Sequence, residues 1–526
     1  MAHKNHGLNK PDNESNSPAD VYYTAVSEKL KDTTINRLPD EVLAKILVLC
    51  VPKRSQARFI SATLKICHVC SLWRSIALSY SEFWRVLVID INDYLDAADA
   101  LEEPPSGGTF ELDNIPEFWF SRANVRPLSF TLKCDSMFFE PPVLAAIVSK
   151  VTPFSHRLQE IDLHVVLLDD LMPFLGMPGG SVPLLEKVTL KIQHPMSTPS
   201  ANMTVFENAR SLRAASIWIS PNFWDEWDSF IFPSNQLTWL DFRDEKGEGL
   251  VPKIFQRILS KCPRIETATF NIGVDIDLDV DDDEGHPSMV NFTQLANLRL
   301  RFMGYADGDS LPHKWRFPAL RTLEICCEFL EITFIFTIPP GVNPSSLRFL
   351  LLSDVAIDMR ELVRFLGECN SLERLAINFP STIKPRQFDV FLDRDARPTL
   401  PNLTNFAVGL KHESGAAELD EIIDMLCKII ISWFDGDSRK KSLEEVLWIF
   451  ALQESSDSED DDAKELEEII EMITARIRGR LKNFLYEKDT LPSGLHLSSR
   501  IVGPYFSFLD NFTSFTGHFA HHSSVQ

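Results

Sequence analysis

The segment 320–377 contains three hexapeptides of the form LxxΦxΦ, where Φ is an apolar residue: LRTLEI (320–325), LRFLLL (347–352) and LERLAI (372–377). Successive starts of this form are 25–31 residues apart, apart from a last step of 40. Such regular spacing predicts a structural repeat, and each short apolar alternation is typical of a strand. The other hexapeptides begin at Leu158, Leu185, Leu212, Leu237, Ile265, Leu295, Leu403 and Leu443.

Helical patterns precede several of these hexapeptides, as in KIFQRILSKCP (253–263) and RELVRFLGECN (360–370). One strand and helix cannot bury their own apolar face, so the units are expected to stack into a curved array. We predict an α/β fold that resembles a leucine-rich-repeat solenoid, with short parallel strands on the concave face and helices outside. The array is irregular, because the ninth position, usually Asn or Cys in that family, holds other residues. An unrelated α/β fold is the alternative, since LxxΦxΦ is a permissive pattern.

A second signal lies in residues 38–84, where LPDEVLAKILVLC (38–50) is followed by VCSLWRSIALSYSEFW (69–84). Pro39, Asp40 and Glu41 are typical of a helix start, because Pro tolerates the first turn and carboxylates favour the positive end of the helix dipole. Apolar residues then recur every three or four positions, which predicts one helix over 42–50 and another over 66–77. These helices carry more apolar residues than so small a unit can bury alone, which indicates a partner.

The motifs LPDE (38–41), VLAKILVLC (42–50), VCSLWRSIA (69–77) and FW (83–84) resemble, in order and spacing, the F-box of fungal, basidiomycete-type proteins. The resemblance implies a three-helix module that docks a Skp-type adaptor and, through it, a cullin-RING ubiquitin ligase. The polar SATLK (61–65) departs from the family's more apolar middle helix. An ordinary helical hairpin packed on the same chain is the alternative. The resemblance assigns adaptor contact to Leu38, Pro39, Val42, Leu43, Ile46 and Leu47, and anchoring to Val69, Cys70 and Trp73, several of which must also serve the module's own core.

The predicted domain order is a disordered tail (1–34), the F-box (35–90), a linker (91–120), the repeat array (121–455) and an acidic segment with a C-terminal helix and tail (456–526). The segment FWFSRANVRPLSFTL (118–132) resembles the first strand after the F-box in fungal family members. The long last step suggests an inserted helix. The segment 421–434 is expected to be a buried amphipathic helix, because it is too short to span a membrane and contains Asp424 and Lys428.

Charge and composition narrow the partners. The net charge of −23, from 75 acidic and 52 basic residues, disfavours a nucleic acid. We expect no secretory signal and no membrane-spanning stretch, and the nine cysteines at scattered spacings fit reduced thiols. We therefore expect a cytoplasmic or nuclear protein.

The sequence carries no recognisable metal-binding or catalytic motif. The acidic run 275–286 fails the EF-hand pattern, since Val280 replaces the required Gly and His286 the required Glu. The pair Cys67 and Cys70 has no second CxxC to complete a zinc site. Phosphate-binding and nucleophile motifs are missing too. We expect no metal, no cofactor and no enzymatic activity, with an enzyme site of unrecognised type as the alternative.

The residues that flank the last Φ of each strand should point to the concave face, because side chains alternate along a strand. In the middle of the array we hypothesise that this face binds an acidic or phosphorylated segment of a target protein, since Arg pairs with carboxylate or phosphate and Trp offers an anchor. The alternative is that these cations pair with acids on adjacent strands. The proposed target-binding residues are Trp218, Arg243, Arg299 and Arg301.

Together these features predict a substrate-recognition subunit of an SCF-type ubiquitin ligase, which holds its target near the ubiquitin-charged enzyme and contributes proximity rather than chemistry. Its partners would be a Skp-type adaptor, a cullin through that adaptor, and a target protein of unknown identity. The alternative is an F-box interaction or scaffold protein that acts outside a ligase.

Overall fold

The computed structural model divides into two compact units, residues 1–131 and 132–526. The predicted tail (1–34) and both acidic runs (275–286 and 454–468) lie outside the described residues, and of 456–495 only three residues are described. The described residues are 38–51, 62–92, 112–136, 141–194, 203–219, 232–244, 249–250, 252–273, 290–303, 315–327, 341–355, 357–379, 384–392, 400–412, 416–434, 445–452, 475, 477, 479 and 496–502.

The described part of the first unit begins with three helices, at the place where the sequence predicts a helical module. The helix start expected near Pro39 is confirmed, because the Pro39 carbonyl accepts hydrogen bonds from the N–H groups of Val42 (2.9 Å) and Leu43 (3.0 Å). The elements in order are α2 (Asp40–Cys50), α3 (Ala62–Cys67), α4 (Ser71–Ser79), η2 (Ser81–Trp84), β1 (Val86–Asp90), η3 (Leu112–Asn114), α6 (Ile115–Arg122) and β2 (Leu128–Lys133), which crosses the division between the units.

The single helix predicted over 66–77 is wrong, because α3 ends at Cys67 and α4 begins at Ser71. Cys70 between them is extended (φ −158°, ψ 171°), and its Sγ accepts the backbone N–H of Trp73 at 3.5 Å. Cys70 therefore caps α4 instead of continuing a helix. The predicted linker (91–120) also contains regular structure, since it includes η3 and most of α6.

Trp84 lies at the centre of the first unit's core. Its side chain is fully buried, and its Nε1–H donates a 2.7 Å hydrogen bond to the Ala77 carbonyl at the end of α4. Its ring makes an edge-to-face contact with Trp119 of α6, with 4.7 Å between the ring centres. One aromatic side chain thus fixes α4 to α6, two elements far apart in sequence.

The second unit is built on a parallel sheet, and every LxxΦxΦ hexapeptide contains a strand. Its strands follow the order β3-β4-β5-β6-β7-β9-β11-β12-β13-β14-β15-β16, so nearly every strand pairs with the next repeat's strand. The bounds are β3 (Leu158–Leu167), β4 (Lys187–His194), β5 (Ala214–Ile219), β6 (Trp239–Asp244), β7 (Thr267–Ile272), β9 (Asn297–Phe302), β11 (Thr322–Cys327), β12 (Phe349–Ser353), β13 (Arg374–Phe379), β14 (Asn405–His412), β15 (Glu445–Leu452) and β16 (His496–Val502), with the short pair β8 (Val290–Asn291) and β10 (Trp315–Arg316) forming a separate sheet.

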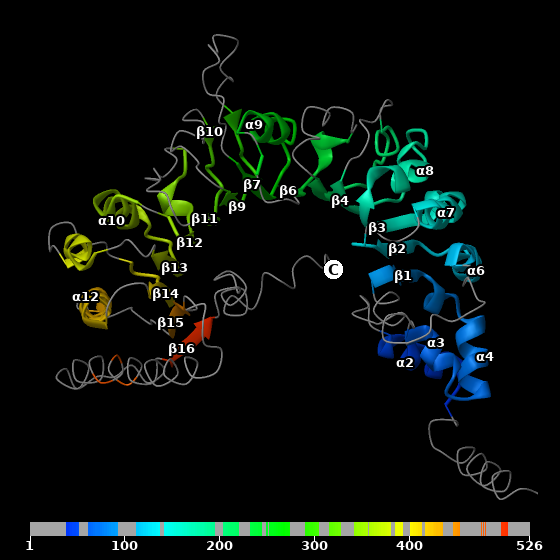
Figure 1. Cartoon of the computed structure of the whole chain (residues 1–526), viewed down its shortest axis with the longest axis horizontal. Coiled ribbons are helices and arrows are strands. Elements are labelled where there is room, and N and C mark those ends of the chain that lie inside the picture. The colour runs from blue at the N-terminus through cyan, green and yellow to red at the C-terminus, as the bar shows by residue number, and fades with distance from the viewer. Residues whose placement is uncertain are drawn as a thin grey trace, which may run out of the picture. The chain divides into compact units, whose positions relative to one another are not determined.

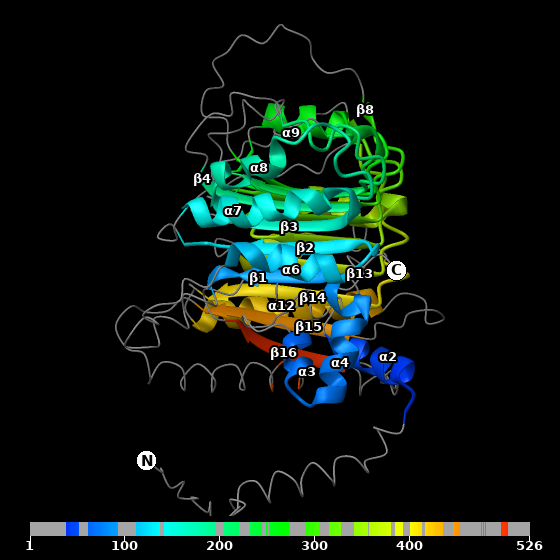
Figure 2. The same cartoon turned by 90° about the vertical axis from the view of Figure 1, so that its right-hand side faces the viewer.

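The helices of this unit lie along one side of the sheet, and the strands form its inner side (Figure 1). Figure 2 shows the strands lying side by side along their length. This is the α/β arrangement of a repeat solenoid. The helices are α7 (Pro141–Val151), α8 (Met172–Leu175), α9 (Pro252–Ser260), α10 (Met359–Glu368), α11 (Asp389–Leu392) and α12 (Ala416–Phe434), with shorter 3-10 turns η4 (Thr152–Arg157), η5 (Leu168–Leu171), η7 (Ser234–Gln236), η9 (Pro344–Ser346) and η10 (Pro385–Phe388).

The leucines of each hexapeptide face the helices and form the core. In LRFLLL, for example, Leu347, Leu350 and Leu352 are all buried. The inserted helix expected before the last hexapeptide is α12, whose Ile422, Ile423 and Leu426 are buried. The sheet continues beyond residue 455, the predicted end of the array, because β16 pairs with β15. In the described part of the chain no helix is both long and apolar enough to cross a membrane.

Candidate protein-binding surfaces

One face of α2 presents apolar side chains to solvent. Val42 is 43 % exposed, Ile46 38 % and Leu49 82 %, and their spacing of four and three residues places them in one line along the helix. We call these three residues the α2 stripe. The opposite face of the helix is buried through Leu43, Ala44 and Leu47. The helix therefore has two apolar faces, one in the core and one outside, which is unusual for a solvated surface helix.

The predicted adaptor-binding residues divide between surface and core. Pro39, Val42, Ile46 and Val69 are exposed, and Val69 is 59 % exposed in the turn between α3 and α4. Leu43 and Leu47 are buried, so they belong to the core of the unit and not to its surface. The half-buried residues are Leu38, Cys70 and Trp73. Sequence analysis missed Leu49, although its distance of three residues from Ile46 was a sufficient signal.

The inner face of the second unit, meaning the strand face opposite the helices, carries a continuous row of side chains in register. Its first six members are polar, and its last four are apolar. The row runs through Thr189, Ser216, Asp241, Thr269, Arg299, Glu324, Leu351, Ala376, Ala407 and Leu447, each paired with the next on the neighbouring strand.

Trp218 and Arg243, two predicted target-binding residues, are neighbours in the register of β5 and β6. The Arg243 guanidinium carbon lies 4.6 Å from the centre of the Trp218 ring, within cation–π range. Lys191 on β4 approaches the same ring, with its Nζ 5.6 Å from the centre. Trp218 is half-buried, so a partner could still reach the ring. The structure thus brings one aromatic and two cationic side chains together.

A buried aspartate and a buried serine hold this group in place. Asp241 is 5 % exposed, and its carboxylate accepts a hydrogen bond from Arg243 Nε (2.7 Å) and one from Ser216 Oγ (3.3 Å). Ser216 Oγ in turn accepts the Trp218 Nε1–H at 3.1 Å. Asp241 and Ser216 therefore fix both the cation and the indole.

Arg299 and Arg301 lie on β9, two strands from Arg243, or about 10 Å away at the usual strand spacing. Arg299 Nε forms a short ion pair with Glu324 on β11. Burial alone would lower the pKa of Arg299, but the charge of Glu324 and its hydrogen bond outweigh burial and raise that pKa. The Arg299–Glu324 pair fits the alternative in which the cations pair with acids on adjacent strands, whereas Arg243 pairs with Asp241 of its own strand. Arg301 is half-buried and stands in register between Asn271 and Cys326.

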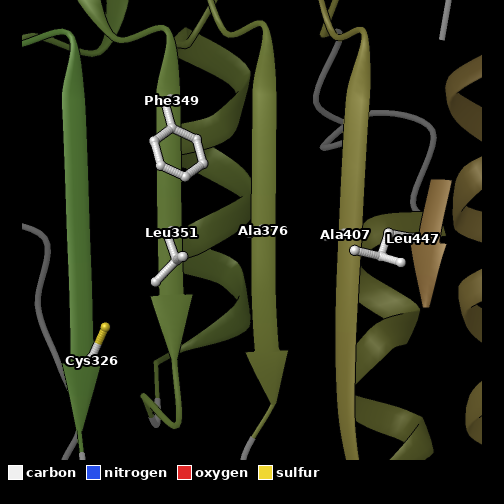
Figure 3. Close-up of a cluster of buried hydrophobic side chains, with 6 residues drawn as sticks. All are labelled: Cys326, Phe349, Leu351, Ala376, Ala407 and Leu447. Carbon is white, nitrogen blue, oxygen red and sulfur yellow. The ribbon is translucent and has the colours of Figure 1, made fainter. Parts of the chain in front are cut away.

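The apolar half of the inner face was not foreseen from the sequence. It consists of Cys326, Phe349, Leu351, Ala376, Ala407 and Leu447. Figure 3 shows these side chains on the strand face opposite the helices drawn behind them. The signal was present in the hexapeptides LRFLLL and LEEVLW, because both hold apolar residues at positions that should face away from the helices.

The remaining site predictions concern metals and thiols. Within the described residues no group of three or more His, Cys, Asp or Glu is placed to hold a metal ion. All nine cysteines are free thiols. Cys67 is buried, and burial raises the pKa of its thiol, with Arg74 opposing that shift.

Comparison with known proteins gives little further guidance. No protein-family model matches this sequence. No curated protein matches it either. Among solved structures, the chain is similar to one in the complex of Rad7 and Elc1 from yeast, with 11 % sequence identity and a TM-score of 0.28 over 92 % of this chain and 98 % of that chain. A TM-score at this level does not establish a common fold.

Proposed function

We propose that this chain is an F-box-type interaction protein, in which the N-terminal helices bind a Skp-type adaptor and the repeat unit binds a target protein. In this proposal it serves as the substrate-recognition subunit of a cullin-RING ubiquitin ligase. It transfers no group itself and acts by bringing the target close to the ubiquitin-charged enzyme.

The observation that carries the proposal is the α2 stripe. Val42, Ile46 and Leu49 are aligned and exposed on a helix whose other face is already buried. An apolar line of this kind is favourable only when a partner covers it. The position of the stripe within the LPDE-to-FW motif order supports a Skp-type adaptor as that partner.

The test is co-purification and calorimetry of the full chain with a Skp-type adaptor. The variant Val42→Asp/Ile46→Asp places two charges in the stripe without touching the buried side of α2. Because each buried Val or Ile contributes about 1.5–3 kcal/mol, we expect affinity to fall by roughly a hundredfold or more. If the wild-type chain does not bind the adaptor, the adaptor-binding half of the proposal is wrong.

A matched control is Ser121→Asp/Val125→Asp, on α6 and in the turn that follows it. Both positions are exposed, and the substitutions add the same two charges to the same unit. This control should bind the adaptor as tightly as the wild type. A cullin that co-purifies with the adaptor and the wild-type chain favours the ligase, whereas an adaptor complex that never recruits a cullin favours a scaffold outside a ligase.

For target binding, the Trp218–Arg243 pair supports a surface that recognises a carboxylate- or phosphate-bearing segment. Trp218→Ala removes an anchor that is half-exposed and leaves the Asp241–Arg243 ion pair in place. We expect such a variant to keep the adaptor and lose proteins that co-purify with the wild type. An unchanged set of bound proteins would remove Trp218 from the binding surface.

A further inference from the structure

One register position on the inner face of the second unit carries cations and no carboxylates. On β4, β5, β6, β7 and β9 this position holds, in order, Lys191, Trp218, Arg243, Asn271 and Arg301. We call these five residues the cationic row. The register extends the row from β3 to β15, and no Asp or Glu occurs along it. In a chain with a net charge of −23, an anionic ligand is the complement of this row.

The three cations of the row recur on every second strand. Lys191 pairs in register with Trp218, and Trp218 pairs with Arg243. Arg243 and Asn271 each stand two residues beyond a registered pair of β6 and β7, and Asn271 pairs with Arg301. Neighbouring strands lie about 4.8 Å apart, so consecutive cations are anchored about 10 Å from one another. A ligand that contacts all three must present its anions at about that interval.

A polyproline II segment has this periodicity. It has three residues per turn and rises about 3.1 Å per residue, so every third side chain lies on the same face about 9.3 Å further along. An extended strand also advances about 10 Å in three residues, but its side chains alternate, so the third one points to the opposite face. An α-helix repeats a face at about 5.4 Å, and reaches about 10.5 Å only after seven residues. The spacing therefore favours anions at every third residue of a polyproline II segment.

The two neutral members of the row suit the residues between those anions. Trp218 is half-buried, and its indole is fixed by the hydrogen bond from Nε1 to Ser216 Oγ (3.1 Å), so it offers a rigid apolar contact. Asn271 is 6 % exposed, and within the described residues its Oδ1 has no hydrogen-bond partner. A polyproline II segment makes no internal hydrogen bonds, so its backbone N–H groups can donate to that oxygen, whereas those of an α-helix are already used.

Part of the row is held in place before any ligand binds. Asp241 engages Arg243 through Nε, so the terminal nitrogens of the guanidinium can contact an anion. Arg243 and Lys191 both lie against the ring of Trp218. Side chains that are already ordered lose less conformational entropy when a ligand binds. The geometry of the free protein therefore favours binding at this end of the row.

We propose that the cationic row binds a polyproline II segment that crosses the strands and carries a carboxylate or phosphate at every third residue. The two outer anions contact Lys191 and Arg301, in one chain direction or the other, and the middle anion contacts Arg243. This inference rests on the proposed role of the inner face in target binding, and it adds the conformation and spacing of the recognised motif.

The first test measures the binding of labelled peptides to the full chain by fluorescence anisotropy. The matched peptide consists of three Asp-Ala-Pro units, and its isomer has the same composition with Asp at alternate positions. We expect the matched peptide to bind roughly tenfold more tightly, because the isomer aligns fewer of its anions with cations. Equal or tighter binding of the isomer, or of a helical peptide with acids seven residues apart, would overturn the proposal. No binding by any peptide at about 1 mM would overturn it too.

A parallel series distinguishes the two sources of negative charge. Phosphoserine replaces each Asp in the matched peptide and in its isomer. The matched peptide should again bind more tightly than the isomer, and the tighter of the two matched peptides identifies the anion that the row prefers. A preference for the isomer in both series would contradict the proposed spacing.

The second test assigns each anion to its cation. In Arg301→Met, replacing one terminal Asp of the matched peptide by Ala should cause no further loss of affinity, whereas replacing the other should still weaken binding by about threefold to fivefold. In Lys191→Met the two ends of the peptide should exchange roles. The matched control, Arg321→Met, removes the same charge at an exposed position outside the row and should bind like the wild type. If both ends matter equally in both variants, the anions are not in register with the row.

These measurements separate this inference from the proposed function. If Trp218→Ala loses its co-purifying proteins while the peptide isomers bind equally, the inner face binds a target but the spacing is wrong. If Trp218→Ala keeps all its proteins and no peptide binds, the target surface itself is wrong. Urea unfolding shows whether Lys191→Met and Arg301→Met keep the fold, and if either does not, the peptide series with the wild-type chain decides.

Discussion

Leu351 of β12 lies opposite Ala376 of β13 in the parallel register, and both side chains are buried on the strand face away from the helices. This pair belongs to the stretch of the inner face where charged side chains give way to apolar ones. Arg299 and Glu324 are the last charged members of the row before Leu351. One sheet face therefore carries two chemically distinct surfaces.

The first prediction concerns how much the inner face contributes to the free energy of unfolding. Leu351→Ala should lower the free energy of unfolding by about 2–5 kcal/mol, as expected for a buried leucine. Leu352→Ala, on the helix side of the same strand and equally buried, is the control and should cost a similar amount in urea unfolding. A loss below about 1 kcal/mol for Leu351→Ala alone would contradict the burial of Leu351 on the inner face.

The second prediction concerns the Arg299–Glu324 ion pair, whose carboxylate is almost completely buried. Arg299→Ala should destabilise the fold by about 3–5 kcal/mol, because it leaves a buried charge without its partner. The double variant Arg299→Met/Glu324→Leu removes both charges and should recover most of that loss. Urea unfolding of Arg299→Met, Glu324→Leu and this double variant gives the coupling energy. Equal losses in Arg299→Ala and the double variant would contradict this account.

The third prediction concerns Trp84 in the first unit. Trp84→Phe keeps an aromatic ring but removes the Nε1–H that donates to the Ala77 carbonyl. The buried carbonyl loses a partner, so we expect a loss of about 1–3 kcal/mol in unfolding. Trp73→Phe, at a half-buried position on α4, is the control and should cost less. When both variants are measured under identical conditions, the loss for Trp84→Phe should exceed the loss for Trp73→Phe if Trp84 lies in the core.

The fourth prediction concerns pH. Burial, with the charge of Asp169 as a smaller cause, raises the pKa of Asp170 to about 6 from an ordinary value of 3.8. The folded state then binds more protons than the unfolded state between these values, so this group makes stability fall as the pH rises from about 4 to 6. At pH 7 the penalty is at most about 3 kcal/mol. Asp170→Asn should remove this pH dependence and be more stable than the wild type at pH 7.

The measurement is urea unfolding of the wild type and Asp170→Asn between pH 4 and pH 7. Below about pH 4 the two proteins should differ little, because Asp170 is then protonated in the folded wild type. Parallel stability curves over the whole range would show that the carboxyl of Asp170 titrates normally in the fold.

The strands of the second unit were predictable because each hexapeptide encodes both a strand and the side that faces the helices. In LERLAI, for instance, Leu372, Leu375 and Ile377 are all buried on that side. The strand β16 was missed because HLSSRI (496–501) lacks the leucine pattern, and its position depends on pairing with β15. Periodicity alone also could not separate α3 from α4, since the break depends on the extended backbone of Cys70.

The binding surfaces were predictable only in part, for a related reason. Spacing along α2 shows which residues are apolar, but only the packed unit shows that Leu43 is buried and Ile46 exposed. Spacing likewise placed Trp218 and Arg243 on one face. The partnership of Arg299 with Glu324 required the register between β9 and β11, which pairs residues 25 positions apart in sequence. Register is a property of the assembled sheet and not of any one segment.

The strand order of the second unit also has a mechanical consequence. In the large sheet, each strand from β4 to β15 is held by one neighbour on either side, and β16 pairs with β15 alone among the described strands. A pulling force applied beyond Val502 would load β16 first and then peel the remaining strands one repeat at a time. Repeats spaced 25–31 residues apart would each release about 80–110 Å of chain. A motor that unfolds the protein from that end would meet a series of small barriers instead of a single large one.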